Sequence, residues 1–531
     1  MNTFSSPSDA ATDPRAAAGP AQVAVAAGNL ADLVRAAAGR AGDKPALIHR
    51  DRVLSWTEVD QQVDRFAAGL QQLGLRSGDR VAIALGNIPE FVLAYFGGLR
   101  ADLVVVPVNT GYTPEELRHI LTDVGAAAFV TSAAGAETGR LLRAQLHDLE
   151  HLVVLDPVGE LAGAVSLEGL LATQPPAGGI VPARSGEDLA VVLYTSGTSG
   201  RPKGAMLSHR ALLANLEQSS QITPPVVAPD DVVLLVLPLF HIFGLNGALG
   251  MVVRHAATGV LAERFDPVET LELIRRRQIT NVVGAPPMYV AWSLLPDVGD
   301  AFTSVRLAVS GSAPLPAAVL SRVLEVTGHH VFEGYGLTET APVLTSTLMS
   351  EVAKPSSIGR PIPGVEVVLR DEQGRPVLEG DPGEVVVRGA NLFSGYWPDG
   401  AGGPDGDGWF PTGDIAVQDA DGDLQVVDRR IEMVLVSGFN VYPREVEEVL
   451  GQHPSIEEAA VLGIAHPYTG EAVKALVVLQ EGARLSAEDV IAHCARSLAR
   501  FKCPTTVEFV PTLPHSVTGK VSKARLREPL R

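Results

Sequence analysis

The stretch YTSGTSGRPKG, from Tyr194 to Gly204, packs hydroxyl residues and glycines into a short segment that carries one lysine, Lys203. Glycines let backbone N–H groups point inward, hydroxyls add hydrogen-bond donors and the lysine adds positive charge, so this composition suits a phosphate. The stretch does not match the GxxxxGK[ST] phosphate loop, because Lys203 follows a proline and precedes a glycine. We therefore expect a phosphate-binding loop of another type; an ordinary flexible Gly/Ser turn is the alternative.

The segments around this loop predict its place in a layered fold. LAVVLYTS before the loop predicts a strand, and SHRALLANLEQS after it predicts a helix that begins near Ser208. Further strands are predicted at 80–85, 103–108, 127–131 and 152–156, and helices at 29–42, 56–74 and 113–125. This alternation, from about residue 23 to residue 357, predicts α/β layers with largely parallel sheets.

One apolar stretch, residues 231–253, has the length of a membrane span. Pro238, His241 and Asn246 interrupt it. A buried strand, a turn and a buried helix explain these breaks better than a membrane helix does, so we predict no membrane span.

The pattern changes in the last third of the chain. Residues 358–427 carry short strands separated by Gly- and Asp-rich turns, which predicts a small antiparallel or barrel-like β subdomain. From residue 428 onwards, helices alternate with strands over about a hundred residues, enough for a small α+β domain.

Composition excludes several classes of partner. Apolar residues make up 46% of the chain, charged residues 19%, and the net charge is −19, which disfavours binding to nucleic acid and to anionic lipid surfaces. Two cysteines, Cys494 and Cys503, are too few for a disulfide framework or a structural zinc site. Residues 1–22 lack the apolar core of a secretory signal and are expected to be a disordered tail. We expect a cytoplasmic protein, monomeric or homodimeric, that acts on small molecules.

Six motifs carry a family resemblance. They are, in order, the Tyr194–Gly204 stretch, PLFHIFG (238–244), GYGLTET (334–340), GWFPTGD (408–414), DRRIEMVLVSGFNVYPREVEE (428–448) and PHSVTGK (514–520). Their sequence and approximate spacing resemble those of the adenylate-forming superfamily, which includes acyl-CoA synthetases, aryl-CoA ligases, luciferases and peptide-synthetase adenylation domains. The segment 409–520 looks most like bacterial fatty acyl-CoA ligases.

The resemblance implies an activity in two steps, with ATP, Mg²⁺ and coenzyme A. A carboxylate, expected to be a medium- or long-chain fatty acid, attacks the α-phosphorus of ATP to give an acyl-adenylate and pyrophosphate, and the thiol of coenzyme A then displaces AMP. By resemblance, Lys520 bridges the substrate carboxylate and the α-phosphate, and Glu339 holds the magnesium with Thr195. A hard cation takes oxygen ligands of this kind.

The resemblance also assigns the remaining site residues. The nucleotide site is implied to comprise Thr195, Ser196, Gly197, Thr198, Ser199, Gly200, Lys203, Gly311, Ser312, Ala313, Glu333, Gly334, Tyr335, Thr338, Asp414, Arg429 and Lys520. Tyr335 is expected to stack on adenine and Asp414 to accept both ribose hydroxyls. The acyl pocket is implied to comprise His241, Met288, Tyr289 and Ser310. Ser437 and Gly438 are implied to border the coenzyme A tunnel.

The implied domains are 23–428, which binds ATP and the acid, and a mobile lid at 432–531, joined by a hinge at 429–431. The hinge position, usually lysine or aspartate in relatives, corresponds to Ile431, and Arg430 and Glu432 are the alternative pivots. Other functions consistent with the motifs are ligation of an aromatic or other non-fatty acid, loading of a carrier protein, a luciferase-type oxygenase, and a catalytically silent nucleotide-binding scaffold.

Overall fold

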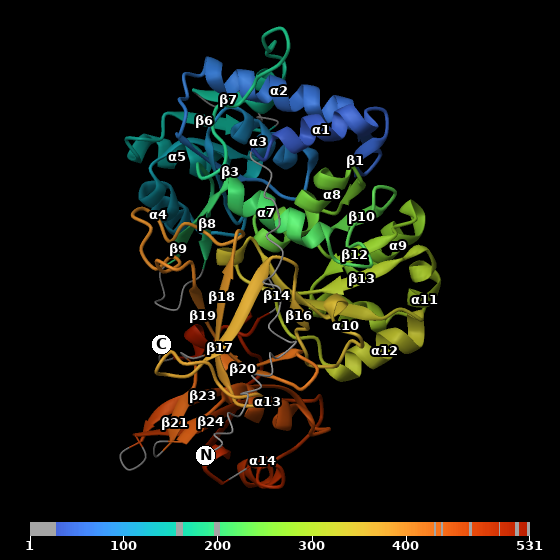
Figure 1. Ribbon diagram of the computed structural model, residues 1–531, viewed down its shortest axis with the longest axis vertical. Coiled ribbons are helices and arrows are strands. Elements are labelled where there is room, and N and C mark those ends of the chain that lie inside the picture. The colour runs from blue at the N-terminus through green and yellow to red at the C-terminus, as the bar shows by residue number, and fades with distance from the viewer. Residues whose placement is uncertain are drawn as a thin grey trace, which may run out of the picture.

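The structure is a computed structural model of the chain (Figure 1). It describes residues 28–155, 163–195, 202–429, 432–436, 439–466, 470–498, 500–515 and 520–527.

A seven-stranded sheet is formed by strands between Arg80 and Ser208, and the described ends of the Tyr194–Gly204 stretch lie at one edge of it. Its order is β7-β6-β5-β3-β4-β8-β9, and all neighbours are parallel except β8 and β9, which form an antiparallel pair. The strands are β3 (Arg80–Ala84), β4 (Val104–Pro107), β5 (Ala126–Thr131), β6 (His151–Val154), β7 (Ala164–Ser166), β8 (Leu189–Thr195) and β9 (Lys203–Ser208).

A nine-stranded sheet forms the second layer, with the order β16-β15-β14-β13-β12-β10-β11-β1-β2. Its central strands are parallel, and the pairs β14–β15, β15–β16 and β1–β2 are antiparallel. The strands are β1 (Pro45–His49), β2 (Arg52–Ser55), β10 (Val232–Leu235), β11 (Thr258–Leu261), β12 (Asn281–Gly284), β13 (Leu307–Ser310), β14 (Val331–Gly336), β15 (Val343–Ser346) and β16 (Arg360–Pro361).

Helices cover both sheets, as the sequence pattern predicted. Successive residues of β3 face opposite sides: Val81 and Ile83 join the core shared with the nine-stranded sheet, while Ala82 and Ala84 pack with α4 and α5. The helices of this part are α1 (Asp32–Ala41), α2 (Trp56–Gln72), α3 (Pro89–Arg100), α4 (Pro114–Val124), α5 (Ala136–Gln145), α6 (Leu167–Leu171), α7 (His209–Ser220), α8 (Met251–His255), α9 (Pro267–Arg277), α10 (Pro286–Ser293), α11 (Val298–Ala301) and α12 (Ala317–Thr327).

The helix after the loop begins where the sequence predicts, because Ser208 caps α7 by accepting a hydrogen bond from the N–H of Ala211 at 3.2 Å. The short strand β9, however, was not predicted. The predicted phosphate loop therefore falls between two antiparallel strands, and the helix follows only after β9.

The apolar stretch 231–253 is a strand, a turn and a helix, as predicted. It forms β10, a π-helix at Phe243–Gly250 and α8. Asn246 is fully buried, and its amide donates to the carbonyls of Leu212 (3.1 Å) and Ala341 (2.7 Å), so this polar side chain links three segments of the core. Among the described residues, no helix has the length and hydrophobicity needed to cross a membrane.

The β subdomain is an antiparallel sheet in the order β17-β18-β19-β20. Leu424 of β20 also forms an antiparallel bridge with Gly359, so hydrogen bonding continues beyond the four strands toward the 358–360 segment. The strands are β17 (Val365–Arg370), β18 (Gly383–Gly389), β19 (Phe410–Gln418) and β20 (Leu424–Arg429).

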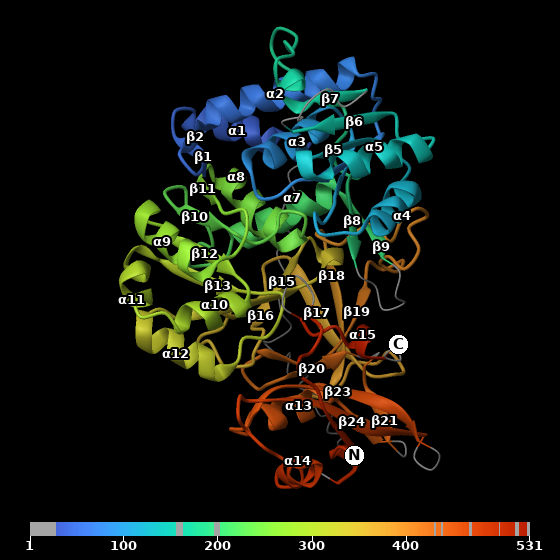
Figure 2. The same cartoon turned by 180° about the vertical axis from the view of Figure 1, so that it is seen from behind.

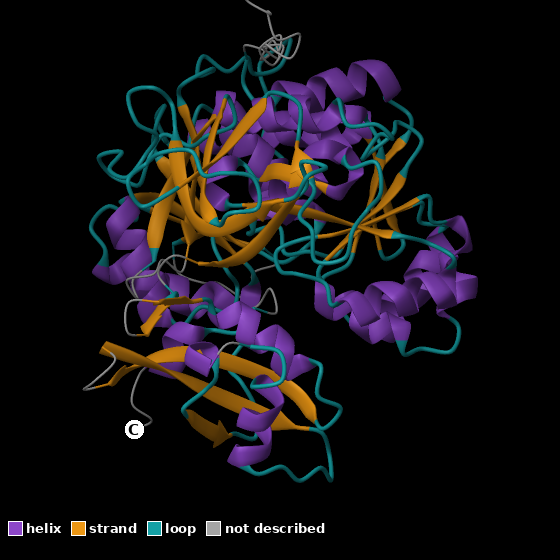
Figure 3. Cartoon of the chain, turned by 60° about the horizontal axis from the view of Figure 1, so that its bottom comes forward, coloured by secondary structure: helices purple, strands orange, loops and turns teal. Residues whose placement is uncertain are grey.

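A small α+β unit with its own apolar core ends the chain (Figure 3). Its sheet has the order β22-β21-β24-β23, with β25 parallel to β24. The elements are β21 (Val434–Val436), β22 (Phe439–Val441), β23 (Ile456–His466), β24 (Gly470–Leu479), β25 (Thr506–Phe509), α13 (Pro443–Gly451), α14 (Ala487–Cys494) and α15 (Lys523–Arg527). Figure 2 shows α15 between the β17–β20 sheet and strands β23 and β24.

Candidate active site

Two predicted site segments meet at one edge of the nine-stranded sheet. Gly284 pairs with Ser310, and Ser310 pairs with Glu333, so the carboxyl ends of β12, β13 and β14 lie side by side. Loops that leave the carboxyl ends of parallel strands are the usual place for ligands in α/β proteins. The sheet thus brings the segments 310–313 and 333–340 together.

Two features of the turn after β13 leave its backbone accessible to a ligand. A Cβ added at Gly311 would lie 2.8 Å from the Phe243 ring, so only glycine fits there without a shift. The next residue, Ser312, has a φ of 73°, a left-handed conformation that is uncommon outside glycine. Backbone groups of this turn can therefore approach a bound nucleotide closely.

The implied adenine and ribose residues touch each other. The Tyr335 hydroxyl donates to Oδ2 of Asp414 at 2.6 Å, and Asp414 is 5% exposed. This contact joins β14 to β19 of the antiparallel sheet. Asp414 also pairs with Arg429 across β19 and β20, which places the backbone of Arg429 beside the same site.

The implied metal residue, Glu339, lies in a short 3₁₀ turn at Thr338–Thr340. Its Oε1 accepts a hydrogen bond of 2.6 Å from the Tyr396 hydroxyl, and its backbone carbonyl accepts from the N–H of Phe393 at 2.9 Å. Within the part of the chain that the structure describes, Oε2 of Glu339 accepts no hydrogen bond. A half-buried carboxylate with one anchored oxygen and one available oxygen fits a magnesium ion, which takes one or two carboxylates plus phosphate and water oxygens.

The residues that flank the predicted phosphate loop lie near this carboxylate. Thr195 at the end of β8 pairs with Lys203 at the start of β9, and the ammonium of Lys203 lies 5.3 Å from the centre of the Tyr396 ring. Tyr396 thus contacts both Lys203 and Glu339. The predicted loop residues Ser196, Gly197, Thr198, Ser199 and Gly200 lie outside the described residues.

The four implied acyl-pocket residues differ in exposure and in bonding. Met288 is buried and its sulfur accepts from the N–H of Ala285. Tyr289 is fully buried, and its hydroxyl donates to the carbonyls of Val309 (2.8 Å) and Val282 (3.2 Å), so it supports the wall of the site from behind. The hydroxyl of Ser310 is buried and has no hydrogen-bond partner among the described residues.

His241 lies between β10 and the π-helix at Phe243–Gly250, and it is half-buried. Burial, together with the positive charge of Lys520, lowers the pKa of His241 to about 4. The imidazole is therefore neutral at pH 7. The charge of Lys520, in the small domain, therefore acts on a side chain of the large domain.

The effect of Lys520 on His241 can be tested by measuring the pKa of His241. In a Lys520→Ala variant, the pKa of His241 is expected to rise, yet to stay below its ordinary value, because burial contributes more than the lysine does. Histidine-selective NMR, assigned with His241→Asn, measures this shift, and Lys520→Arg keeps the charge as a control. A pKa that is equal in Lys520→Ala and the parent protein would contradict the contact.

Glu333 is a buried carboxyl group on the nucleotide side. Burial raises its pKa to about 7, although the N–H of Leu315 donates to its Oε1 at 2.9 Å and Arg444 of the small domain stabilises the charged form. Between pH 4.5 and 7 the folded protein therefore holds a proton that the unfolded chain releases. The stability contributed by this group declines as pH rises through that window.

Glu333→Gln is expected to remove this pH dependence. Between pH 5 and pH 8 the ionisation of Glu333 is expected to lower the free energy of unfolding of the parent protein by about 2 kcal/mol. Glutamine does not ionise, so the variant should not show this loss. Urea unfolding at the two pH values measures the difference. Glu325→Gln, on the exposed face of α12, is the matched control. Parallel stability profiles for parent and Glu333→Gln would contradict the prediction.

The implied coenzyme A residues, Ser437 and Gly438, and the hinge residues Arg430 and Ile431 lie outside the described residues. The described neighbours on either side belong to different sheets. β20 ends at Arg429 in the antiparallel sheet, whereas β21 begins at Val434 in the sheet of the small domain.

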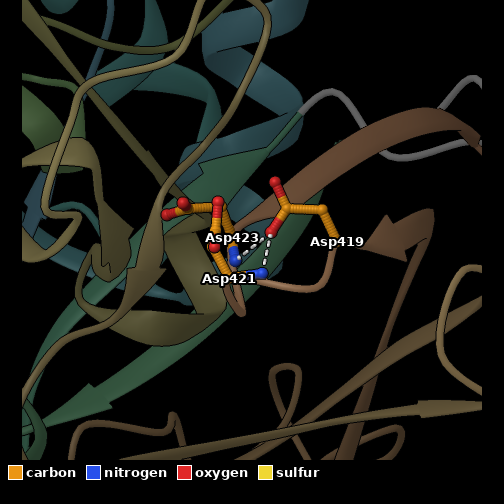
Figure 4. Close-up of side chains that lie close together, drawn as sticks. All are labelled: Asp419, Asp421 and Asp423. Atoms are coloured by element: carbon orange, nitrogen blue, oxygen red, sulfur yellow. Dashed lines mark hydrogen bonds between the residues drawn. The ribbon is translucent and has the colours of Figure 1, made fainter.

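An acidic cluster in the β19–β20 turn is the one group of possible metal ligands found among the described residues. It comprises Asp419, Asp421 and Asp423 (Figure 4). The ammonium of Lys354 lies 2.5, 2.6 and 3.2 Å from their carboxylates, in that order. A side-chain cation therefore already balances this cluster, which is a structural ion network.

Sequence reasoning missed Tyr396. Its segment, SGYWPDG, combines glycines, a proline and two aromatic residues, which marks a turn but gives no sign of a contact with Glu339, 57 positions away. Burial and the Glu339 charge raise the pKa of this phenol well above its ordinary value, so it remains a hydrogen-bond donor.

Comparison with known proteins agrees with this geometry. The family model "AMP-binding enzyme" matches residues 34–397, and "AMP-binding enzyme C-terminal domain" matches residues 445–520. A long-chain-fatty-acid–CoA ligase of Yersinia pestis is 37% identical over 94% of both chains, and a feruloyl-CoA synthase of Amycolatopsis is 36% identical over 91% of this chain and 95% of its own. A crystal structure of ATP-bound MatB from Rhodopseudomonas palustris has a TM-score of 0.85 and 33% identity, covering 94% of this chain and 98% of that one. The chain belongs to the AMP-binding enzyme family.

Proposed function

We propose that the protein is an AMP-forming acyl-CoA ligase that joins a medium- or long-chain fatty acid to coenzyme A in two steps. The observation that carries this proposal is the geometry at one sheet edge, where the Tyr335 hydroxyl donates to Asp414 and the Tyr396 hydroxyl donates to Glu339. A cation delivered by a second domain to that edge can neutralise a carboxylate and a phosphate that must approach each other.

In the first step the described residues position two anions. The Tyr335–Asp414 pair holds the nucleoside, with a carboxylate available to accept ribose hydroxyls, while Lys203 at the start of β9 faces the triphosphate. Mg²⁺, when bound through Glu339 and Thr195, supplies charge compensation at the phosphates. Lys520 then stabilises the charge that develops as the carboxylate oxygen meets the α-phosphorus.

In the second step the proposed lid turns about residues 429–431, which removes Lys520 and brings Ser437 and Gly438 to the acyl-adenylate. A glycine at that position leaves room for a thiol to reach the carbonyl carbon. The thioester forms as AMP leaves.

The preference for a fatty acid rests on the relatives and on the character of the pocket residues. Five relatives from enteric bacteria and one from Bacillus subtilis, at 33–37% identity, are long-chain-fatty-acid–CoA ligases. Met288 is buried and apolar, and the half-buried His241 is neutral at pH 7. Neither offers a charge that would favour a second carboxylate on the substrate.

A second candidate is ligation of an aromatic acid. The 36% identity to feruloyl-CoA synthase supports it, as does the fold of a benzoate CoA ligase from Burkholderia xenovorans LB400, with a TM-score of 0.83 and 28% identity.

A CoA-dependent AMP-release screen tests the proposal. Purified protein with ATP and Mg²⁺ is given straight-chain acids from two to eighteen carbons, together with benzoate and ferulate. We expect the highest kcat/KM with acids of eight carbons or more. A maximum at an aromatic acid would favour the second candidate, and no release of AMP with any acid would refute both.

The proposal includes a cytoplasmic location and a monomeric or homodimeric state. Both cysteines are buried thiols, which suits a reducing compartment. Size-exclusion chromatography with light scattering measures the oligomeric state.

A further inference from the structure

Tyr396 bridges two parts of the nucleotide site that lie far apart in the sequence. Its hydroxyl donates to Oε1 of Glu339 at 2.6 Å, and its ring lies 5.3 Å from the ammonium of Lys203. A single side chain therefore contacts the carboxylate implied to hold the metal and the lysine of the phosphate loop.

The backbone around Tyr396 is fastened to both partners. The N–H of Trp397 donates to the carbonyl of Gly204 at 2.7 Å, next to Lys203, and the N–H of Met206 donates to Gly395 at 3.0 Å. On the other side, the N–H of Phe393 donates to the backbone carbonyl of Glu339 at 2.9 Å. The backbone that carries the ring is thus held by hydrogen bonds on both sides before any ligand binds.

We propose that Tyr396 is a positioning residue for the metal–triphosphate complex: its hydroxyl aims the carboxylate of Glu339 at the metal, and its ring aims Lys203 at the phosphates. This inference rests on the proposed function for the identity of the ligand.

The hydroxyl acts on the geometry of the carboxylate. Because Oε1 is held by a short hydrogen bond, Glu339 presents Oε2 as a single ligand in a fixed direction, which suits the strict octahedral geometry of magnesium. Loss of a hydrogen bond to a metal-binding carboxylate typically weakens metal binding by about ten- to a hundredfold.

The ring acts on the lysine separately. A lysine stem has four rotatable bonds, and an ammonium near the face of a tyrosine is attracted by the ring electrons. Phenylalanine keeps most of this attraction and removes only the hydroxyl. Leucine removes both. The two substitutions therefore separate the two roles.

The test measures binding directly as well as activity. Mn²⁺ binding in the presence of α,β-methylene-ATP is followed by electron paramagnetic resonance, and metal-free binding of the same nucleotide is followed by calorimetry. Tyr396→Phe is expected to raise the Kd for Mn²⁺ by about tenfold and to leave metal-free nucleotide binding within twofold of the parent. Tyr396→Leu is expected to weaken both.

Trp397→Phe is the matched control. Trp397 follows Tyr396 in the same segment, and its indole N–H donates to the carbonyl of Asp123 at 2.9 Å. If loss of any hydrogen bond in the segment loosened the site, this control would weaken Mn²⁺ binding as well. We expect it to bind Mn²⁺ as the parent does.

Activity gives a second readout. In pyrophosphate exchange, Tyr396→Phe is expected to require about ten times more Mg²⁺ for half-maximal rate, with a maximal rate at saturating Mg²⁺ close to that of the parent. An unchanged Kd for Mn²⁺ in Tyr396→Phe, or an equal weakening in Trp397→Phe, would overturn the inference. Because the binding arm needs no acid, it remains decisive even if the fatty-acid assignment fails.

Discussion

Replacement of Lys520 by alanine is expected to slow carboxylate-dependent exchange of pyrophosphate into ATP by about a hundred- to a thousandfold, the usual cost of removing one preorganised group that stabilises transition-state charge. The transfer of a supplied acyl-adenylate to coenzyme A is expected to change by less than about threefold, because in our proposal Lys520 has left the site before that step. Separate assays of the two half-reactions measure the contrast.

The structure gives a physical reason for this asymmetry. The charge of Lys520 acts on the half-buried His241, and our proposal takes this arrangement as the one that the first step needs. Three residues further on, Lys523 is ion-paired with Glu447 (2.8 Å) and Glu432 (3.1 Å), which fastens α15 to the body of the small domain. The lysine loop therefore moves as the small domain moves.

A control variant separates this role from a general loss of positive charge. Lys474→Gln removes another cation of the small domain, one paired with Glu508 at 2.7 Å on the β24–β25 sheet. It should leave both half-reactions near the parent rates. Equal damage to both half-reactions in Lys520→Ala would mean that the lysine supports the fold instead of the chemistry.

Local sequence patterns predicted most of the fold. The strands β3, β4, β5, β6 and β8 and the helices α1, α2, α4 and α7 lie where β-branched runs and helical spacing indicated, because these patterns follow from which face of each element is buried. Strand β9 was missed. Its sequence, KGAMLS from Lys203 to Ser208, contains no β-branched residue and so gives no strand signal. The strand forms because it pairs with the edge of β8.

The motifs predicted individual site residues but not the contacts between them. The motifs include Tyr335, Asp414 and Glu339. No local sequence pattern, however, predicts that the Tyr335 hydroxyl donates a hydrogen bond to Asp414, 79 positions away. The raised pKa of Glu333 depends in the same way on burial by other segments and on Arg444, so its cause lies in the assembled fold. Contacts between distant segments are a property of packing, and a single sequence does not record them.

Replacement of Ile431 by proline is expected to leave acyl-adenylate formation within about fivefold of the parent and to suppress thioester formation by about a hundredfold or more. The proposal requires Lys520 and then the 437–438 segment of the same domain to reach one site, so the chain must turn between the two steps. Proline fixes φ near −65° and also restricts the residue before it, here Arg430. Single-turnover quenching, with acyl-adenylate and thioester measured together, follows both products.

The described flanks support a pivot at 430–431. Arg429 is the last residue of β20 and pairs with Asp414 in the antiparallel sheet, so it stays with the nucleotide side. Glu432 is ion-paired with Lys523, and β21 begins at Val434 in the small-domain sheet, so both are expected to move with the lid. This leaves two residues to absorb a change in φ and ψ, which argues against Glu432 as the pivot.

Ile431→Ala is the matched control for the proline variant. It removes the β-branched side chain, which restricts the backbone, while it keeps the N–H and the freedom of φ. Because a less restricted residue turns more easily, thioester formation in Ile431→Ala is expected to match or exceed that of the parent. Unchanged thioester yield in Ile431→Pro would place the pivot elsewhere; a loss of both products, with an unfolding transition at lower temperature, would mean that the segment serves the fold and not the turn.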